Sequence, residues 1–395
     1  MGWVGRVAAK AIDQPESLAG RLLSPALRVW ANSLEQPRLV PLEGKPCAVY
    51  IAPANWAGQG YLWARSLEAN HPALQAVSMA TTSKADYSFV TDIAVSPPVY
   101  NLSSRWHASQ LEYLSGFTHV LIEAERPLFG ERYGHDPFVE ARMLIERGME
   151  VAMICHGHDI RLPSRNIATE RWSPYAASEH ADLFERVALR NRAGLDGLGA
   201  PVFVSTPDLL VDVPYAMWLP LVVDVSRWAS DRPVSDRSRP RIVHVPSSSA
   251  LKGTHLIAET MNGFANDGIV EYVLAENLKS KDMPAIYGSA DVVLDQFMVG
   301  SYGVAACEAM AAGRIVIGHV SEQVREHVKT FTGFDVPIVE ATVETLHDVI
   351  VDIIGNPSAY SHVGAAGVAF VTAVHDGRKA ARVLGAFVGA STAEP

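Results

Sequence analysis

The sequence has few of the features that mark secreted, disulfide-bonded or membrane-spanning proteins. Its three cysteines, Cys47, Cys155 and Cys307, lie far apart in apolar segments and lack the spacing of metal ligands. Such cysteines are typical of reduced side chains in the core of a cytosolic protein. No apolar run reaches the roughly 18 residues that a membrane span needs, and the N-terminus has too short an apolar core for a signal peptide. We therefore expect a soluble, cytoplasmic protein.

Charged residues and several catalytic motifs are also scarce. Only 19% of the residues are charged and the net charge is −10, so a nonspecific grip on nucleic-acid phosphates is disfavoured. The sequence contains no Gly-x-Ser-x-Gly elbow, no Walker loop and no strict Gly-x-Gly-x-x-Gly. It therefore lacks the motifs on which the corresponding hydrolase and NTPase sites are built. Apolar residues are abundant: 48% of the 395 residues are hydrophobic, which is ample for two cores.

Apolar, strand-like runs alternate with helical stretches along the whole chain, and this alternation predicts α/β layers with parallel sheets. The expected strands are Cys47–Ala52, one near Ala76–Met79, His119–Glu123, Val151–Cys155, Val202–Ser205, Arg241–Val245, Val270–Val273, Val292–Leu294 and Ile315–Ile317. Residues 219–241, rich in Asp, Arg, Ser and Pro, separate two runs of such units. This predicts a first domain at 1–221 and a second at 222–375, followed by a terminal helix at 376–395.

The segment from Tyr287 to Gly318 has the most specific pattern. It predicts a buried strand, a glycine-bracketed loop at 300–303, a short helix whose one acidic residue is Glu308, and a second strand. A glycine loop that opens a helix presents backbone N–H groups and the positive end of the helix dipole, which suits a phosphate. A carboxylate further along suits the hydroxyls of a ribose. The segment therefore indicates half of a nucleotide-diphosphate site, with an ordinary βαβ unit as the alternative.

This pattern resembles the donor-binding segment of retaining glycosyltransferases of the GT-B fold, in the glycosyltransferase 4-like group of bacterial polysaccharide type. The run from Glu308 to Ala311, followed by Gly313, matches the second half of the family's motif. The family has a first glutamate eight residues earlier, which helps to orient the donor sugar, and that position is Gly300 here. The resemblance implies two doubly wound Rossmann-like domains facing across a cleft, with the terminal helix crossing back onto the first domain.

The first expected strand ends in a loop that contains Gly58 and Gly60. Glycines let the backbone approach a ligand closely, and the helix that begins near Tyr61 favours an anion at its N-terminus. In the family, the loop at this place lies over the donor diphosphate and the acceptor. We therefore expect Gly58 and Gly60 to contact the donor, with a plain strand–helix turn as the alternative.

Polar residues 156–161 follow the apolar strand Val151–Cys155, where a cleft is expected. The resemblance implies that His156 points at the sugar ring as a catalytic residue and that Asp159 and Arg161 shape the loop on the acceptor side. Two alternatives stay open, namely a metal site of His156, His158 and Asp159, or a histidine with a structural role. Enzymes of this family generally need no bound metal.

Lys252 stands before a glycine at a predicted helix start and resembles the family's pyrophosphate lysine. A lysine at a helix N-terminus opposes the helix dipole, so pairing with a bound anion explains its placement and gives it a catalytic role. Many relatives have an arginine five residues earlier, where this chain has Ser247. The expected donor contacts in this half are Ser247, Lys252, Asp295, Ser301, Tyr302, Gly303 and Glu308.

Glu125 and Arg126 follow the strand His119–Glu123 and are, with Asp159 and Arg161, the expected acceptor-side residues. Residues 17–33 are mildly amphipathic. We expect them to pack on the body of the protein, with weak docking at the inner membrane face, where lipid-linked acceptors reside, as the alternative.

The resemblance implies transfer of a hexose or related sugar from a nucleoside-diphosphate donor to an acceptor hydroxyl, with retention and without a metal or cofactor. The donor nucleotide is UDP or GDP, and the acceptor is a glycan, a lipid-linked sugar, a small molecule or a protein. The acidic charge disfavours nucleic acid. Two alternatives stay open: a degenerate partner that binds a nucleotide sugar without turnover, because Gly300 and Ser247 lack the family's charges, and a nucleotide-sugar epimerase.

Overall fold

The computed structural model describes residues 18–82, 89–234, 237–246, 248–276 and 278–390, with side chains from residue 25 onward. The described chain forms two compact units. The first contains the described residues up to Cys155, Asn191–Phe203 and the described residues from Leu384, and the second contains His156–Arg190 and Val204–Val383. These units differ from the predicted division after residue 221, because 156–190 and 204–221 belong to the second unit.

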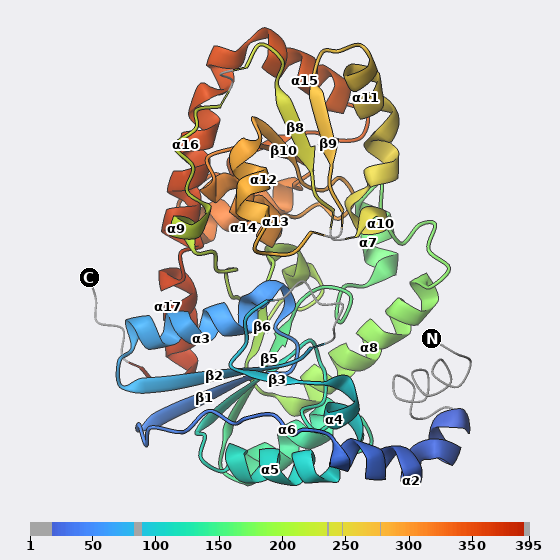
Figure 1. Cartoon of the computed structure of the whole chain (residues 1–395), viewed down its shortest axis with the longest axis vertical. Coiled ribbons are helices and arrows are strands. Elements are labelled where there is room, and N and C mark those ends of the chain that lie inside the picture. The colour runs from blue at the N-terminus through green and yellow to red at the C-terminus, as the bar shows by residue number, and fades with distance from the viewer. Residues whose placement is uncertain (1–17, 83–88, 235–236, 247, 277, 391–395) are drawn as a thin grey trace. The chain divides into compact units, whose positions relative to one another are not determined.

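A parallel sheet forms the core of the first unit (Figure 1). Within the first unit its strands follow the order β3-β2-β1-β4-β5-β6. Their bounds are β1 (Cys47–Ala52), β2 (Leu74–Thr81), β3 (Ile93–Val95), β4 (His119–Glu123), β5 (Glu150–Cys155) and β6 (Val202–Val204). A further short strand, β7 (Met217–Trp218), belongs to residues of the second unit. β1 pairs in parallel with β2 and β4, and every residue after its first is buried. A strand buried on both faces reads as a continuous apolar run, which is why the sequence revealed it.

The helices that contribute to this unit are α2 (Leu18–Ser33), α3 (Gln59–Asn70), α4 (Pro97–Leu102), α5 (Ser104–Leu114), α6 (Pro137–Glu146) and parts of α8 (Ala181–Leu198) and α17 (Arg378–Phe387). The end of α2 packs on α4, because Leu27 and Ala31 share a small buried cluster with Leu102. This is the packing expected of residues 17–33, for the side chains that the structure describes.

The second unit contains a five-stranded parallel sheet in the order β12-β11-β10-β8-β9. Its strands are β8 (Arg241–His244), β9 (Glu271–Leu274), β10 (Val292–Leu294), β11 (Ile315–Gly318) and β12 (Ile338–Glu340). Helices α11 (Thr254–Asn266) and α15 (Leu346–Gly355) cover one face, because Ile257 and Ile350 join Val292 and Ile317 in one buried core.

The remaining helices of the second unit are α7 (Pro163–Thr169), α9 (Val225–Trp228), α10 (Ser249–Lys252), α12 (Met283–Ser289), α13 (Val304–Ala311), α14 (Glu322–Thr332) and α16 (Pro357–Val374). Helices α13 and α16 approach closely, because a Cβ on Gly367 would lie 3.2 Å from the Met310 side chain. Among the helices of the described ranges, none combines the length and the apolar character that crossing a membrane requires.

All nine predicted strands occur, and β1, β4 and β10 have the predicted bounds. Strands β3, β7 and β12 were missed. Each has only two or three residues and, unlike the three-residue strands β6 and β10, none of them is buried throughout, so their apolar signal is weaker.

Candidate functional site

The carboxyl ends of β8, β10, β11 and β12 meet at one edge of the second sheet, because all these strands run parallel. Ligands bind at this edge in α/β sheets. The loops there carry Lys252 after β8, Asp295 and Gly300 after β10, and His319 after β11. The structure thus brings most of the predicted donor contacts of the second half to one side of one sheet.

The loop between β10 and α13 is organised from within by Gln296, which is only 5% exposed. The side-chain amide of Gln296 donates to the carbonyls of Ser301 and His319, and its oxygen accepts the N–H groups of Met298 and Val299. Gly300 sits in the left-handed region with φ of 65°. The hydrogen bonds of this one side chain thus define the shape of the loop.

Helix α13 follows this loop and carries Glu308. Gly303 precedes the helix and has no side chain to cap it, so the positive end of the helix faces the loop region. Ser301 and Tyr302 are buried, whereas Glu308 is half-buried. Burial raises the pKa of Glu308 to about 8, against the opposing effect of Arg227 and Lys252.

Lys252 ends α10, and the left-handed Gly253 separates it from α11. Its ammonium pairs with the Asp295 carboxylate at 2.5 Å, and the Asp295 side chain is 3% exposed. Two predicted donor contacts are therefore joined to each other, and part of the lysine's charge is offset. Ser247, another predicted donor contact, lies outside the described residues.

The loop after β5 is held by its own polar groups. The Asp159 carboxylate accepts the backbone N–H groups of His156 and Gly157, while His158 bonds to the Tyr175 hydroxyl at 2.7 Å. Burial, followed by the charge of Arg161, lowers the pKa of His158. In the described part of the chain, no group of three or more His, Cys, Asp or Glu side chains is arranged to hold a metal ion.

Arg161 forms a largely buried ion pair with Asp208, at 2.6 Å from Nη2 to Oδ2. Burial tends to raise the pKa of Asp208, but the Arg161 charge and its hydrogen bond bring it below the usual value. This pair connects the loop after β5 to the segment after β6, and so fixes the shape of the loop that carries His156.

The glycine loop of the first unit already contains a carboxylate. Glu123, at the end of β4 and fully buried, accepts the Asn55 N–H at 3.0 Å. A Cβ on Gly60 would lie 2.9 Å from the same carboxylate, and the Asn55 side chain accepts the Tyr61 N–H at 2.9 Å. The start of α3, where an anion is predicted, is thus closely approached by an acidic side chain of the chain itself. Gly58 is buried beside it, with φ of 77°.

Glu125 and Arg126, predicted on the acceptor side, belong to the first unit, whereas Asp159 and Arg161 belong to the second. Glu125 is buried and accepts from the Cys155 thiol at 3.1 Å. Arg126 is exposed, and its guanidinium lies over the Trp56 ring at 5.8 Å from the centroid.

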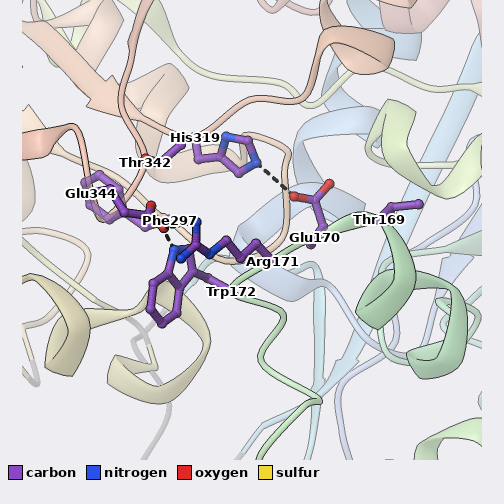
Figure 2. Close-up of a pocket in the computed structure, with 8 residues that line it drawn as sticks. All are labelled: Thr169, Glu170, Arg171, Trp172, Phe297, His319, Thr342 and Glu344. Atoms are coloured by element: carbon purple, nitrogen blue, oxygen red, sulfur yellow. Dashed lines mark hydrogen bonds and ion pairs between the residues drawn. The ribbon is translucent and has the colours of Figure 1, made fainter.

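A cavity of about 390 Å³ opens at the ends of β10, β11 and β12, and its lining residues come from four segments (Figure 2). They are Thr169, Glu170, Arg171, Trp172, Phe297, His319, Thr342 and Glu344. Sequence reasoning missed all of them. His319 directly follows a buried strand, the same signal that singled out His156, so it could have been found. Glu170 follows a helix and gives no such signal.

No protein-family model matches the sequence, and a comparison with curated proteins found no match. The fold, in contrast, has many solved counterparts. A sucrose-phosphate synthase from Thermosynechococcus elongatus matches with a TM-score of 0.59 at 13% identity, over 86% of this chain and 97% of the other.

Two further structures contain a nucleotide sugar. HepE from Anabaena, solved with UDP-glucose, matches with a TM-score of 0.56 at 11% identity, over 87% of this chain and 99% of HepE. An α-glucosyltransferase, solved with UDP-glucose and DNA containing an abasic site, matches with a TM-score of 0.56 at 9% identity, over 87% and 99%. These neighbours are GT-B glycosyltransferases, and this chain has the GT-B fold.

Proposed function

We propose that this protein is a glycosyltransferase that moves a sugar from a nucleoside-diphosphate donor to an acceptor hydroxyl, with retention and without a metal ion. The observation that carries the proposal is the gathering of Lys252, Asp295, Glu308 and the loop 300–303 at the carboxyl edge of one parallel sheet. The fold supports it, because neighbours of the same fold were solved with UDP-glucose.

In the proposed complex, the diphosphate contacts the Lys252 ammonium and the first turn of α13. Asp295 holds the ammonium in place before the ligand arrives. As the bond from the anomeric carbon to the phosphate oxygen breaks, negative charge grows on the diphosphate, and preorganised positive groups lower the barrier. Because Asp295 offsets part of the lysine's charge, the helix N-terminus supplies a share of the stabilisation.

The remaining groups hold the ribose and the sugar. Glu308 accepts hydrogen bonds from the ribose hydroxyls, and His156 faces the sugar ring. The acceptor hydroxyl attacks the anomeric carbon from the face that the leaving group occupies, and its proton passes to the departing phosphate oxygen. One carbon–oxygen bond forms as the other breaks, so the reaction needs no nucleophile from the protein. UDP is the first nucleotide to test, because these neighbours were solved in complex with UDP-glucose.

A second candidate is a partner protein that binds a nucleotide sugar without turnover. Two observations favour it: residue 300 is a glycine, so it carries no carboxylate of its own, and Lys252 is already paired with Asp295. Both features reduce the charge available to stabilise a departing diphosphate.

Lys252→Ala should weaken UDP binding by about tenfold or more, because a charge-assisted contact is worth roughly 1.5–3 kcal/mol. Lys281→Ala is the matched control, since Lys281 is an exposed lysine of the same unit. Calorimetry with UDP and GDP measures both variants. Equal affinities in wild type and Lys252→Ala would contradict the phosphate role.

Turnover separates the two candidates. Release of UDP from UDP-glucose, even by slow hydrolysis without an acceptor, identifies an enzyme. Tight binding of the same nucleotide sugar, without any release of UDP over many hours, supports the partner protein.

A further inference from the structure

Segment 169–172, which begins at the last residue of α7, contacts the loops after two strands of the second sheet. The Glu170 carboxylate bonds to His319 Nε2 at 2.8 Å, and the Trp172 indole donates to Glu344 at 3.0 Å (Figure 2). The segment and the strand ends line the open cavity of about 390 Å³. This volume lies in the range of small-molecule sites.

Glu170 also fills the space beside Gly300. A Cβ on Gly300 would overlap the Glu170 carboxylate, and φ at this glycine is 65°. The Ser321 N–H donates to the Gly300 carbonyl at 2.9 Å, which ties the loop after β10 to the loop after β11. The Glu170 carboxylate, from a segment distant in the sequence, thus lies against Gly300, which has no side chain.

The charges in the cavity balance. His319 contacts Glu170 through Nε2 and Glu340 through Nδ1, at 2.8 and 2.6 Å, and these hydrogen bonds raise its pKa to about 9. It is therefore protonated at neutral pH and sits between two carboxylates. Arg171 pairs with Glu344 at 2.9 Å. Each cation among the described lining residues has a carboxylate partner, so the cavity is poorly suited to a phosphate.

The cavity does suit hydroxyl groups. Glu170 Oε2 accepts from His319, whereas Oε1 has no hydrogen-bond partner among the described residues. Thr342 adds a hydroxyl, Trp172 an aromatic ring and Phe297 a buried apolar surface. A carboxylate oxygen accepts hydroxyl hydrogen bonds, and apolar and aromatic side chains contact the carbon skeleton of a bound ligand.

We propose that this cavity binds the hydroxylated ring of a neutral sugar, and that Glu170 selects the ring by accepting its hydroxyl hydrogen bonds. His319 is a positioning residue, because its hydrogen bond through Nε2 orients the Glu170 carboxylate. The inference rests on the proposed function where the ring is the sugar of a nucleotide donor. An acceptor sugar has the same chemistry, and the experiment distinguishes the two sources.

The test compares wild type with Glu170→Gln and with Glu326→Gln, a control at an exposed glutamate of α14. Calorimetry measures the dissociation constants of UDP, UDP-glucose, UDP-galactose and UDP-N-acetylglucosamine. We expect Glu170→Gln to weaken the best nucleotide sugar by about tenfold and to leave UDP unchanged, because an amide is a weaker acceptor than a carboxylate. The control should match wild type for every ligand.

Saturation-transfer NMR with glucose and maltose, at saturating UDP and without it, tests the acceptor source. A loss confined to free sugars, at unchanged nucleotide-sugar affinity, supports the cavity and assigns it to the acceptor. A second variant, Trp172→Ala, removes the aromatic ring, and thermal unfolding checks that each variant is folded. If both variants bind nucleotide sugars and free sugars as wild type does, the inference is wrong.

Failure of the proposed function gives a different result. If wild type binds no nucleotide, that proposal fails, while free-sugar binding that weakens in Glu170→Gln still supports the cavity. Absence of any sugar binding overturns the inference itself.

Discussion

At the scale of single residues, Glu308 is held in an unusual protonation state. Burial raises its pKa from 4.5 to about 8, although Arg227 and Lys252 favour the ionised form. The folded state thus binds more protons than the unfolded state between these two values. The stability linked to this group is fully present below pH 4.5 and is lost as the pH rises through 8.

Glu308→Gln, which resembles the protonated form, should gain stability relative to wild type as the pH rises from 5 to 9. Denaturant unfolding at several pH values measures this difference. Above pH 8, where the Glu308 carboxylate is ionised, the same variant should weaken UDP binding but not the binding of a 2′,3′-dideoxyribose analogue, because the ionised carboxylate is the stronger acceptor for ribose hydroxyls. Equal UDP affinity, with altered stability alone, would make Glu308 a structural residue.

The pKa of His319 is raised, as that of Glu308 is, but here the raised pKa favours the charged form of the side chain. Its hydrogen bonds to Glu170 and Glu340 raise the pKa from 6.5 to about 9, against the effect of burial. Arg325 also contacts Glu340, at 2.9 Å. The stabilisation is fully present below pH 6.5 and is lost as the pH rises through 9.

His319→Gln should therefore destabilise the protein most below pH 6.5 and progressively less toward pH 9 and above. Unfolding free energies of wild type and variant across this range are the measurement. His347→Gln is the control, because His347 is an exposed histidine of the same unit. A stability difference independent of pH would mean that the imidazolium is not the stabilising form.

At the scale of secondary-structure elements, the loop between β10 and α13 depends on Gly300. Gly300→Ala places a Cβ against the Glu170 carboxylate and a side chain at φ of 65°. We expect destabilisation by more than about 1 kcal/mol, the typical cost of the left-handed region for a residue other than glycine. Calorimetric unfolding measures it.

Gly333→Ala separates the two causes, because Gly333 has φ of 80° and a Cβ added there would point into open space. The excess cost of Gly300→Ala over this control is the effect of the overlap with Glu170. If the two variants lose equal stability, Glu170 moves aside at no cost.

At the scale of the whole molecule, activity should survive strong chelation, and His156→Ala should reduce turnover far more than UDP affinity. Lys252, Glu308 and the loop 300–303 are the proposed nucleotide contacts, whereas the proposed role of His156 is at the sugar. Interactions made as the glycosidic bond breaks affect turnover and not ground-state binding. Steady-state kinetics and calorimetry on the same preparations measure turnover and UDP affinity.

Stoichiometric zinc or manganese in the purified protein, with activity lost to a chelator and restored by the metal, would contradict the metal-independent mechanism.

The sequence revealed the parallel α/β class, nine of the strands and the residues that lie at their carboxyl ends. These features are local: a strand buried on both faces must be apolar, and a polar residue directly after it lies at the ligand edge of the sheet. Asp295 was found in this way, whereas Lys252 and Glu308 were found because their segments resemble the family's motifs. The division of the chain into units was not local, because segments 156–190 and 204–221 join the second half.

The contacts between distant segments were decided only when the chain folded. Nothing near Glu170 in the sequence indicates that its carboxylate lies beside Gly300, or that it shares His319 with Glu340. In the same way, Lys252 and Asp295 were expected as separate donor contacts but form one ion pair. A local pattern records which residues a strand or helix requires. The packing of elements far apart in the chain decides which loops meet at the edge of a sheet. Such packing does not produce a periodic pattern in the sequence.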